Sequence, residues 1–184
     1  MKNKNNSPKL DFAVLGGGCF WCLDEMYSRF RGVKNVTAGY AGGRKVNPNY
    51  EEVCTGNTGH AEVIKVEYDP KQINYEDLLN VFFSVHNPTT LNRQGSDVGT
   101  QYRSIILYDT QEKKELAQKI IRKFNHEEIY PDPIVTELKP LINFYPAEDY
   151  HQKYFQKNPQ NFYCQAVISP KLAKVRKMFH QYYE

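Results

Sequence analysis

The clearest hydrophobic pattern near the start of the chain is a short apolar run that ends in three glycines. Residues 12–15 are apolar, and glycines occupy positions 16–18. This run predicts a buried strand that breaks into a tight turn. Apolar residues then recur at three- and four-residue steps over 20–30, which is the period of a helix. We therefore expect Cys19 to lie in the first turn of a helix.

Strand and helix patterns alternate along the middle of the chain. Residues 62–68 alternate as a strand does, and one face would carry Glu62 together with Ile64, Val66 and Tyr68. Further patterns predict, in order, a helix capped by Asn74 and Asp77, a strand over 104–108, a helix capped by Thr110, a strand over 134–138 and a final helix capped by Ser169.

Three stretches have no clear period. Residues 32–49 are rich in Gly, Asn and Pro and predict strand pieces and loop. Residues 87–99 predict a long polar loop, which in a compact domain is usually functional. Residues 145–165 are aromatic and polar with little periodicity. Because strands and helices alternate elsewhere, we expect an α/β or α+β class built around one sheet.

Composition narrows the possible function classes. A chain of 184 residues suits one domain, which we place at 11–184 after a disordered polar lead at 1–10. The net charge of +3 is too small to indicate a nucleic-acid partner. No apolar stretch is long enough for a signal peptide or a membrane span, so we expect a cytoplasmic protein.

Four cysteines stand at Cys19, Cys22, Cys54 and Cys164. In a cytosolic chain they indicate catalysis, transient redox work or metal binding more than structural disulfides. A zinc site would need two more ligands near the Cys-x-x-Cys pair, and the five histidines are scattered, so we expect no metal. For Cys54 we expect a packing role in the core.

Cys19 is the strongest candidate for a catalytic thiol. It follows three glycines and starts a predicted helix, where free amide groups favour an anion and lower a cysteine pKa. Cys22 lies one turn ahead, which leaves thioredoxin-like dithiol exchange open. Phe20 and Trp21 between the two cysteines are large and apolar, which favours a pocket for an apolar group beside the thiol.

Several segments, taken together and in order, resemble one family, the peptide methionine sulfoxide reductases of type A. Their spread from about residue 12 to 169 makes the resemblance far more specific than any single motif. The segments are GCFW (18–21), NPNYEEVCTG and TGHAEV (47–63), HNPTT (86–90), NRQGSD (92–97), GTQYRS (99–104), EDYHQ (148–152) and KNP (157–159).

The resemblance implies a reaction and a fold. The reaction is reduction of methionine-S-sulfoxide, free or in proteins, to methionine, with thioredoxin as the reductant and no other cofactor. The fold is an α+β two-layer sandwich, with a mixed β-sheet, flanking helices and a long irregular C-terminal segment. We expect a monomer that acts on oxidised proteins or free methionine sulfoxide.

The resemblance also implies residue roles. The Cys19 thiolate would attack the sulfoxide sulfur and become a sulfenic acid, and Glu62 would donate a proton to the oxygen. The strand pattern supports Glu62 independently, because a carboxyl on the apolar face would be buried and stay protonated. Tyr50 and Tyr102 would hold the sulfoxide oxygen, and Asp97 would lie near the backbone of the bound residue.

Phe20 and Trp21 would form the wall around the substrate methyl group. Two thiols could resolve the sulfenic acid: Cys164 matches the recycling cysteine of the family in a segment expected to be mobile, and Cys22 is closer in sequence. Cys22 is a departure, because the family more often has Gly there. We favour a relay that uses both thiols.

A second departure is Asn87, where the family usually has Asp. We expect it to change local hydrogen bonding without loss of activity. Two rival functions also stay open at this point: a general thiol-disulfide oxidoreductase, and a redox-sensing or sulfoxide-binding module without turnover.

Overall fold

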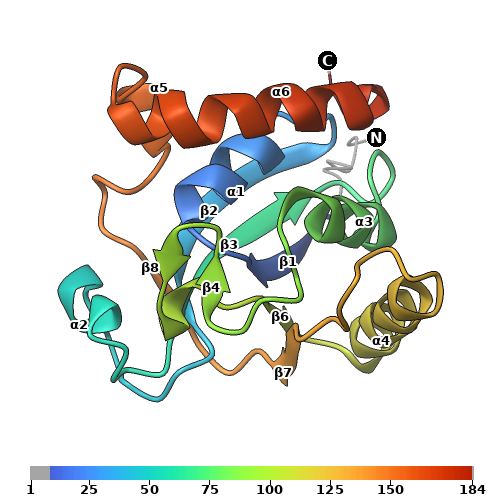
Figure 1. Ribbon diagram of the computed structural model, residues 1–184, viewed down its shortest axis with the longest axis horizontal. Helices are drawn as coiled ribbons and strands as arrows, with labels where there is room; N and C mark the ends of the chain where they lie inside the picture. Colours follow the sequence, from blue (N-terminus) through green and yellow to red (C-terminus); the bar gives the residue numbers. More distant parts are fainter. Residues whose placement is uncertain (1–8, 184) are drawn as a thin grey trace, which may run out of the picture.

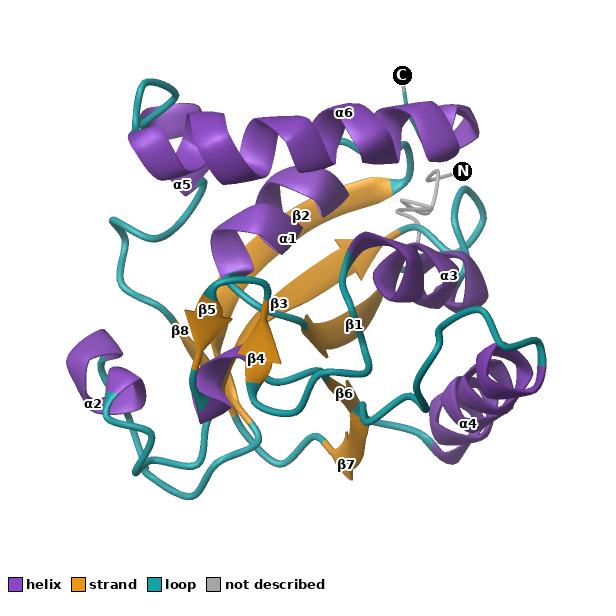
Figure 2. Ribbon diagram, in the orientation of Figure 1, coloured by secondary structure: helices purple, strands orange, loops and turns teal. Residues whose placement is uncertain are grey.

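The centre of the fold is a six-stranded sheet with the strand order β7-β6-β1-β3-β2-β8. A computed structural model describes residues 9–183, so the expected disorder of residues 1–10 falls almost wholly outside the described residues. Figure 2 shows the sheet in orange. Its strands are β1 (Asp11–Gly16), β2 (Val33–Ala41), β3 (Ala61–Tyr68), β6 (Ile105–Tyr108), β7 (Glu137–Pro140) and β8 (Phe144–Pro146).

The sheet is mixed, because β6 and β7 run parallel while the other neighbouring strands run antiparallel. Strand β3 is paired on both sides, with β1 and with β2. The predicted apolar face of β3 is confirmed, since Ile64, Val66 and Tyr68 lie in the main core. The opposite face is also covered, because Val63 is fully buried in a second, smaller core. A glutamate at the start of β3 is therefore removed from water.

Helices cover one face of this sheet and make the larger core with it. Figure 1 shows α1 over β2 and β3, with α6 packed across the outside of α1. On the other face, the described residues form a smaller apolar cluster, covered in part by Leu141 and Phe144. The helices are α1 (Phe20–Tyr27), α2 (Tyr50–Cys54), α3 (Tyr75–Val85), α4 (Gln111–His126), α5 (Tyr154–Lys157) and α6 (Ser169–Met178).

Two predicted helix starts are confirmed by their caps. Asn74 accepts from the Asp77 amide at 2.8 Å, and the Asp77 carboxylate accepts from the Asn74 amide at 3.2 Å. The Thr110 hydroxyl accepts from the Lys113 amide at 3.3 Å. Each cap satisfies donors that the helix leaves free and stabilises the fold by about 1 kcal/mol.

The predicted cap at Ser169 is wrong, because the chain is already helical there. A π-helical turn, η2 (Cys164–Ile168), runs directly into α6, and the Ser169 hydroxyl donates to the Cys164 carbonyl at 3.1 Å. The irregular part of the C-terminal segment therefore ends before Cys164. Cys164 lies in this π-helical turn and is fully buried. The mobility that we expected for its segment stays a prediction.

Short elements that the sequence pattern did not reveal lie within the aperiodic stretches or directly beside them. They include α2, the two-stranded hairpin of β4 (Arg93–Gln94) and β5 (Asp97–Val98), the turn η1 (Thr100–Tyr102), α5 and β8. The predicted strand near 134–138 begins later, as β7. Within residues 9–183, none of the helices is long and apolar enough to cross a membrane.

Candidate active site

The turn between β1 and α1 places Cys19 at the point where helix, sheet and hairpin meet. A side chain on Gly16 would come within 2.7 Å of the Glu62 carbonyl oxygen. Gly18 has a φ of +88°, and a side chain there would lie 2.6 Å from the Gln94 side chain. The glycines therefore let neighbouring parts of the protein approach the turn closely, which fixes the position of Cys19.

Cys19 is the N-cap residue of α1 and is partly exposed. Burial raises the pKa of its thiol well above the usual range, and the hydrogen bond with Cys22 and the charge of Glu62 add to this rise. The predicted lowering of the Cys19 pKa is therefore wrong: desolvation outweighs the helix N-terminus at this site. The thiol is protonated in this arrangement.

Glu62 lies at the start of β3 with its carboxyl against the first turn of α1. Its Oε2 accepts from the Phe20 amide at 3.0 Å, and only 2 % of the residue is exposed. Burial raises the pKa of Glu62 to about 8, although the Phe20 amide opposes the rise. At neutral pH the carboxyl is therefore mostly protonated, directly beside the residue that carries the candidate thiol.

Two tyrosines from two different short helices lie near Glu62. Tyr50 begins α2, and Tyr102 ends η1, where its carbonyl accepts from the Gly18 amide at 3.1 Å. The charge of Glu62 acts on both phenols. Burial is the main reason that the pKa of each tyrosine lies above its usual value. Both hydroxyls therefore stay protonated and can donate hydrogen bonds.

Asp97, on β5, is the acceptor for a tyrosine from the C-terminal segment. The Tyr163 hydroxyl donates to Asp97 Oδ2 at 2.9 Å. Tyr163 also packs edge-on against Trp21, with ring centroids 6.0 Å apart. Tyr163 therefore closes one side of the site and has no role assigned from the sequence.

Trp21 is an apolar side chain of the site whose orientation is fixed by a hydrogen bond and by ring stacking. Its indole Nε1 donates to His151 Nδ1 at 3.1 Å, and its ring stacks on Tyr154 with centroids 3.7 Å apart. Trp21 is partly exposed, whereas Phe20 has no exposed surface and packs behind it against His151. The two residues thus occupy different layers of the site.

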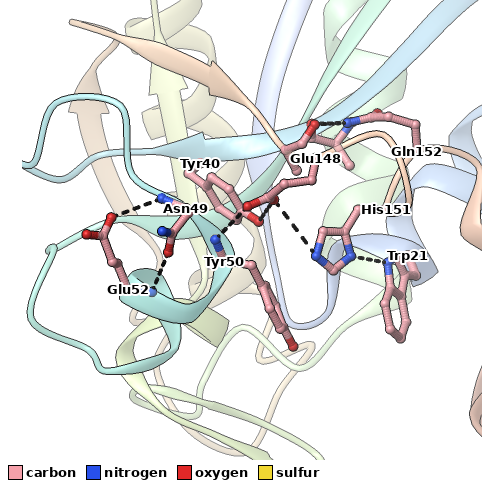
Figure 3. Close-up of polar contacts among 10 residues, drawn as sticks. Trp21, Tyr40, Asn49, Tyr50, Glu52, Glu148, His151 and Gln152 are labelled. Carbon is pink, nitrogen blue, oxygen red and sulfur yellow. Dashed lines mark hydrogen bonds and ion pairs between the residues drawn. The ribbon is translucent and has the colours of Figure 1, made fainter.

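Glu148 connects these parts, as Figure 3 shows. Its Oε1 accepts from the Tyr50 amide at 2.8 Å, and its Oε2 accepts from the Tyr40 hydroxyl at 2.8 Å. Its Oε2 also lies 4.0 Å from His151 Nε2. Sequence reasoning gave Glu148 and His151 no role, although both belong to the EDYHQ segment.

The three other cysteines divide into two buried thiols and one exposed thiol. Cys22 and Cys164 lie in the main core, close enough for the charge of Cys22 to raise the pKa of Cys164, after burial as the larger cause. The hydrogen bond from Cys19 lowers the pKa of Cys22. Cys54 is exposed, so its predicted place in the core is wrong. Its thiol is hydrogen-bonded with the Tyr50 hydroxyl.

No metal centre accompanies these groups in the described part of the chain. Residues 9–183 contain no cluster of three or more His, Cys, Asp and Glu side chains placed to hold an ion. What the site offers is a thiol, a neutral carboxylic acid, two phenol donors and an indole wall. This set suits a thiol attack on a polar oxygen-bearing group with an apolar substituent.

Comparisons with known proteins point the same way. The family model of peptide methionine sulfoxide reductase matches residues 11–183. The curated peptide methionine sulfoxide reductase MsrA of Polynucleobacter asymbioticus is 53 % identical over 174 residues, which cover 95 % of this chain and 92 % of that protein.

Solved structures share the fold. The reduced form of Mxr1 from Saccharomyces cerevisiae has a TM-score of 0.79 and 36 % identity, and covers 89 % of this chain and 92 % of its own. Mxr1 in complex with Trx2 has a TM-score of 0.57 and 26 % identity, and covers 84 % of this chain and 89 % of its own. The predicted α+β fold around a mixed sheet is thereby confirmed.

Proposed function

The chain belongs to the peptide methionine sulfoxide reductase family, and from this premise we propose how its residues perform the reaction. The enzyme is an oxidoreductase that reduces methionine-S-sulfoxide to methionine at the expense of thiols. One observation carries the assignment of its residues. The buried Glu62 carboxyl, with a pKa of about 8, accepts the amide of Phe20, the residue that follows Cys19.

Cys19 is the nucleophile. Its sulfur attacks the sulfoxide sulfur, and the sulfoxide oxygen moves to Cys19, which becomes a sulfenic acid while the substrate leaves as a thioether. One thiol and one sulfoxide thus give one sulfenic acid and one thioether, with no net gain or loss of protons. The position of Cys19 at the N-cap of α1 supports this role, because the Trp21 amide in the first turn hydrogen-bonds the Cys19 sulfur and favours its negative charge.

Glu62 is the general acid that protonates the oxygen as it is transferred. A carboxyl with a pKa of about 8 is mostly protonated at pH 7, so a proton is available when the substrate binds. The protonated Tyr50 and Tyr102 hydroxyls donate to the same oxygen, in the manner of an oxyanion hole. Their hydrogen bonds would strengthen as negative charge builds up on that oxygen.

Trp21 forms the wall against the substrate methyl group, and Phe20 supports it from behind. The ring of Tyr154 stacks on the indole of Trp21 and holds it in place from the side of the C-terminal segment. Asp97 binds near the backbone of the methionine sulfoxide residue. Asp97 accepts one hydrogen bond from Tyr163. Because a carboxylate has several acceptor sites, Asp97 can also accept a hydrogen bond from a substrate amide.

A relay of thiols resolves the sulfenic acid. Cys22 attacks Cys19, releases water and forms the first disulfide, and Cys164 then attacks Cys22 to form the second. The order is supported by the hydrogen bond between Cys19 and Cys22 and by the proximity of Cys22 to Cys164. Because Cys19 lies outside the helix, at the N-cap, this pairing does not require α1 to unwind.

Thioredoxin then reduces the outer disulfide, and the Mxr1–Trx2 complex supports a partner of this kind. We propose that no metal or organic cofactor takes part, that no nucleic acid is bound and that the protein is a single-domain monomer. The four free cysteines suit a cytoplasmic location, where thiols are kept reduced.

The test offers each epimer of methionine sulfoxide to the enzyme with dithiothreitol and measures the methionine formed. We expect turnover of the S epimer only, and none with Cys19→Ser. A parallel insulin-reduction assay separates the rival thiol-disulfide oxidoreductase, which would act on insulin without needing Glu62. Reduction of insulin disulfides with no methionine formed would refute the assignment as a methionine sulfoxide reductase.

The relay has its own test. Mass mapping after one turnover should find a Cys19–Cys22 disulfide in Cys164→Ser. In the unmodified enzyme it should find both disulfides at first and the Cys22–Cys164 disulfide alone at the end. If Cys164→Ser recycles with thioredoxin at the normal rate, the relay is wrong.

A further inference from the structure

We propose that Glu148 is a positioning residue that fixes both walls of the reaction site, Tyr50 on one side and Trp21 on the other. The inference rests on the proposed function of those two residues. Glu148 itself makes no contact with the substrate in this proposal. It acts through the two groups that its carboxylate holds.

The first of the two interactions, called here the first branch, is the hydrogen bond between Glu148 and the start of α2. Glu148 Oε1 accepts from the Tyr50 amide at 2.8 Å, while Oε2 accepts from the Tyr40 hydroxyl on β2 at 2.8 Å. Helix α2 has only five residues, so its own hydrogen bonds do little to fix its direction. The carboxylate therefore ties the start of α2 to the sheet and sets where the Tyr50 hydroxyl points.

The second branch reaches Trp21 through His151, as Figure 3 shows. The indole Nε1 donates to His151 Nδ1 at 3.1 Å, so that nitrogen is an acceptor and carries no proton. The proton of the neutral ring is then on Nε2, which is buried without a hydrogen-bond partner and lies 4.0 Å from Glu148 Oε2. A negative carboxylate at this place favours the tautomer that can accept from Trp21.

The turn that carries Glu148 and His151 is itself fixed to the sheet. The Gln152 amide donates to the Ala38 carbonyl and accepts from the Ala38 amide, both at 2.9 Å. It also donates to the Ala147 carbonyl at 2.9 Å. This pairing with β2 gives the carboxylate a rigid base, which a positioning residue needs.

The hydrogen bond from Trp21 to His151 should be sensitive to acid, and the charge of Glu148 should set the pH at which it breaks. Burial lowers the pKa of His151, and the negative charge of Glu148 opposes this effect. The other titratable groups whose rings pack on His151 are Tyr50 and Tyr150, and the pKa of each is raised, chiefly by burial, so they stay neutral. Protonation of Nδ1 at low pH would break the bond from Trp21. Removal of the Glu148 charge should therefore lower the pH at which this bond breaks.

The sequence supplies a direct probe, because Trp21 is the only tryptophan in the chain. The variant is Glu148→Gln, which carries no charge and replaces one of the two oxygens that accept from the Tyr50 amide and the Tyr40 hydroxyl with an NH2 donor. The matched control is Glu52→Gln. Glu52 accepts from the Asn49 amide at 3.1 Å and so also holds the start of α2, but from the solvent side and away from Trp21.

Tryptophan emission is titrated with acid in the absence of substrate for each protein. We expect a lower midpoint in Glu148→Gln than in the unmodified enzyme, and an unchanged midpoint in Glu52→Gln. In a His151→Phe background, Glu148→Gln should have no further effect on the emission. A midpoint unmoved by Glu148→Gln, or moved equally by both glutamine variants, overturns the second branch.

Kinetics test the first branch. We expect Glu148→Gln to lower kcat/KM by about tenfold or more, the size of a lost hydrogen bond to a charged group, with changes in both kcat and KM. Glu52→Gln should stay within about twofold, as expected for an exposed carboxylate. Equal losses in the two variants would mean that Glu148 only stabilises α2. If the unmodified enzyme reduces no sulfoxide, the proposed function fails, while the emission titration still decides the positioning of Trp21.

Discussion

Glu62→Gln should make the protein more stable at neutral pH while it removes most of the activity. Gln has the shape of the protonated acid, and its carbonyl oxygen can still accept from the Phe20 amide. It cannot donate a proton to the sulfoxide oxygen, so single-turnover reduction should slow by roughly 10²–10⁴-fold, the usual contribution of a general acid. The gain in stability follows from the raised pKa of Glu62.

The magnitude follows from the difference between the folded and unfolded states. The pKa of Glu62 is about 8 in the fold, against 4.5 for an unperturbed glutamate. The folded state therefore holds the proton more tightly, and ionisation of the unfolded chain weakens the fold as pH rises from 4.5 toward 8. This linkage costs about 1 kcal/mol at pH 5, about 3 kcal/mol at pH 7 and between about 4 and 5 kcal/mol at pH 9.

The assay is urea denaturation of both proteins at pH 5, 7 and 9 with dithiothreitol present. The advantage of Glu62→Gln should be small at pH 5 and grow with pH. The control is Glu137→Gln. It makes the same chemical change at a glutamate whose pKa is shifted in the opposite direction, so its effect on stability should have the opposite sign. Burial alone would raise the pKa of Glu137, but its contacts with Lys139 and Arg103 lower it. A lowered pKa stabilises the fold at pH values above the pKa of the unfolded chain, and this stabilisation is lost in acid. Glu137→Gln should therefore have a lower free energy of unfolding than the unmodified enzyme at pH 7 and 9.

Two results would refute the reasoning. A stability difference for Glu62→Gln that stays the same at all three pH values would mean that the pKa of Glu62 is not raised in the fold. A variant that reduces methionine sulfoxide within threefold of the normal single-turnover rate would mean that Glu62 is not the acid.

Three further outcomes can be checked separately. Tyr102→Phe should lower kcat by roughly 10²–10³-fold with little change in KM, as for loss of one oxyanion donor, measured by steady-state methionine release. Gly18→Ala should lower the free energy of unfolding by roughly 1–3 kcal/mol in a urea titration, since φ is +88° and the new methyl would meet Gln94. Brief alkylation read by mass spectrometry should modify the exposed Cys54 well before the buried Cys22; equal rates would contradict the burial pattern.

Elements with a long, regular hydrophobic period could be predicted from the sequence. The period in β3 identified the buried face of Glu62, and the caps at Asn74 and Thr110 located two helices. Helix α2 and the β4–β5 hairpin are too short to show a period, so they were missed. Burial of single residues depends on such short elements, which is why Cys54 was assigned to the core.

The contacts that complete the site are non-local and leave no local pattern. The Trp21 indole meets a histidine 130 positions away, and the Tyr50 amide meets a carboxylate 98 positions away. The sequence expectation for Cys19 failed for a related reason. The helix start that should lower its pKa is visible in the sequence, whereas the burial that raises it depends on tertiary packing. Tyr163, for example, is distant in sequence but close enough for charge to act between it and Cys19.

A protonated Cys19 is consistent with catalysis, because the reaction needs no net supply of protons. The thiol and the Glu62 carboxyl hold two protons before the attack, and the sulfenic acid and the restored carboxyl hold two afterwards. Burial raises the pKa of both groups, so the same environment keeps the whole set of protons in the site. In the mechanism that we propose, Glu62 delivers its proton to the oxygen, and the thiol proton replaces it. In this proposed mechanism, the burial of Glu62 that lowers stability also keeps its carboxyl protonated at neutral pH. A variant that recovers that stability should therefore lose the proton donor.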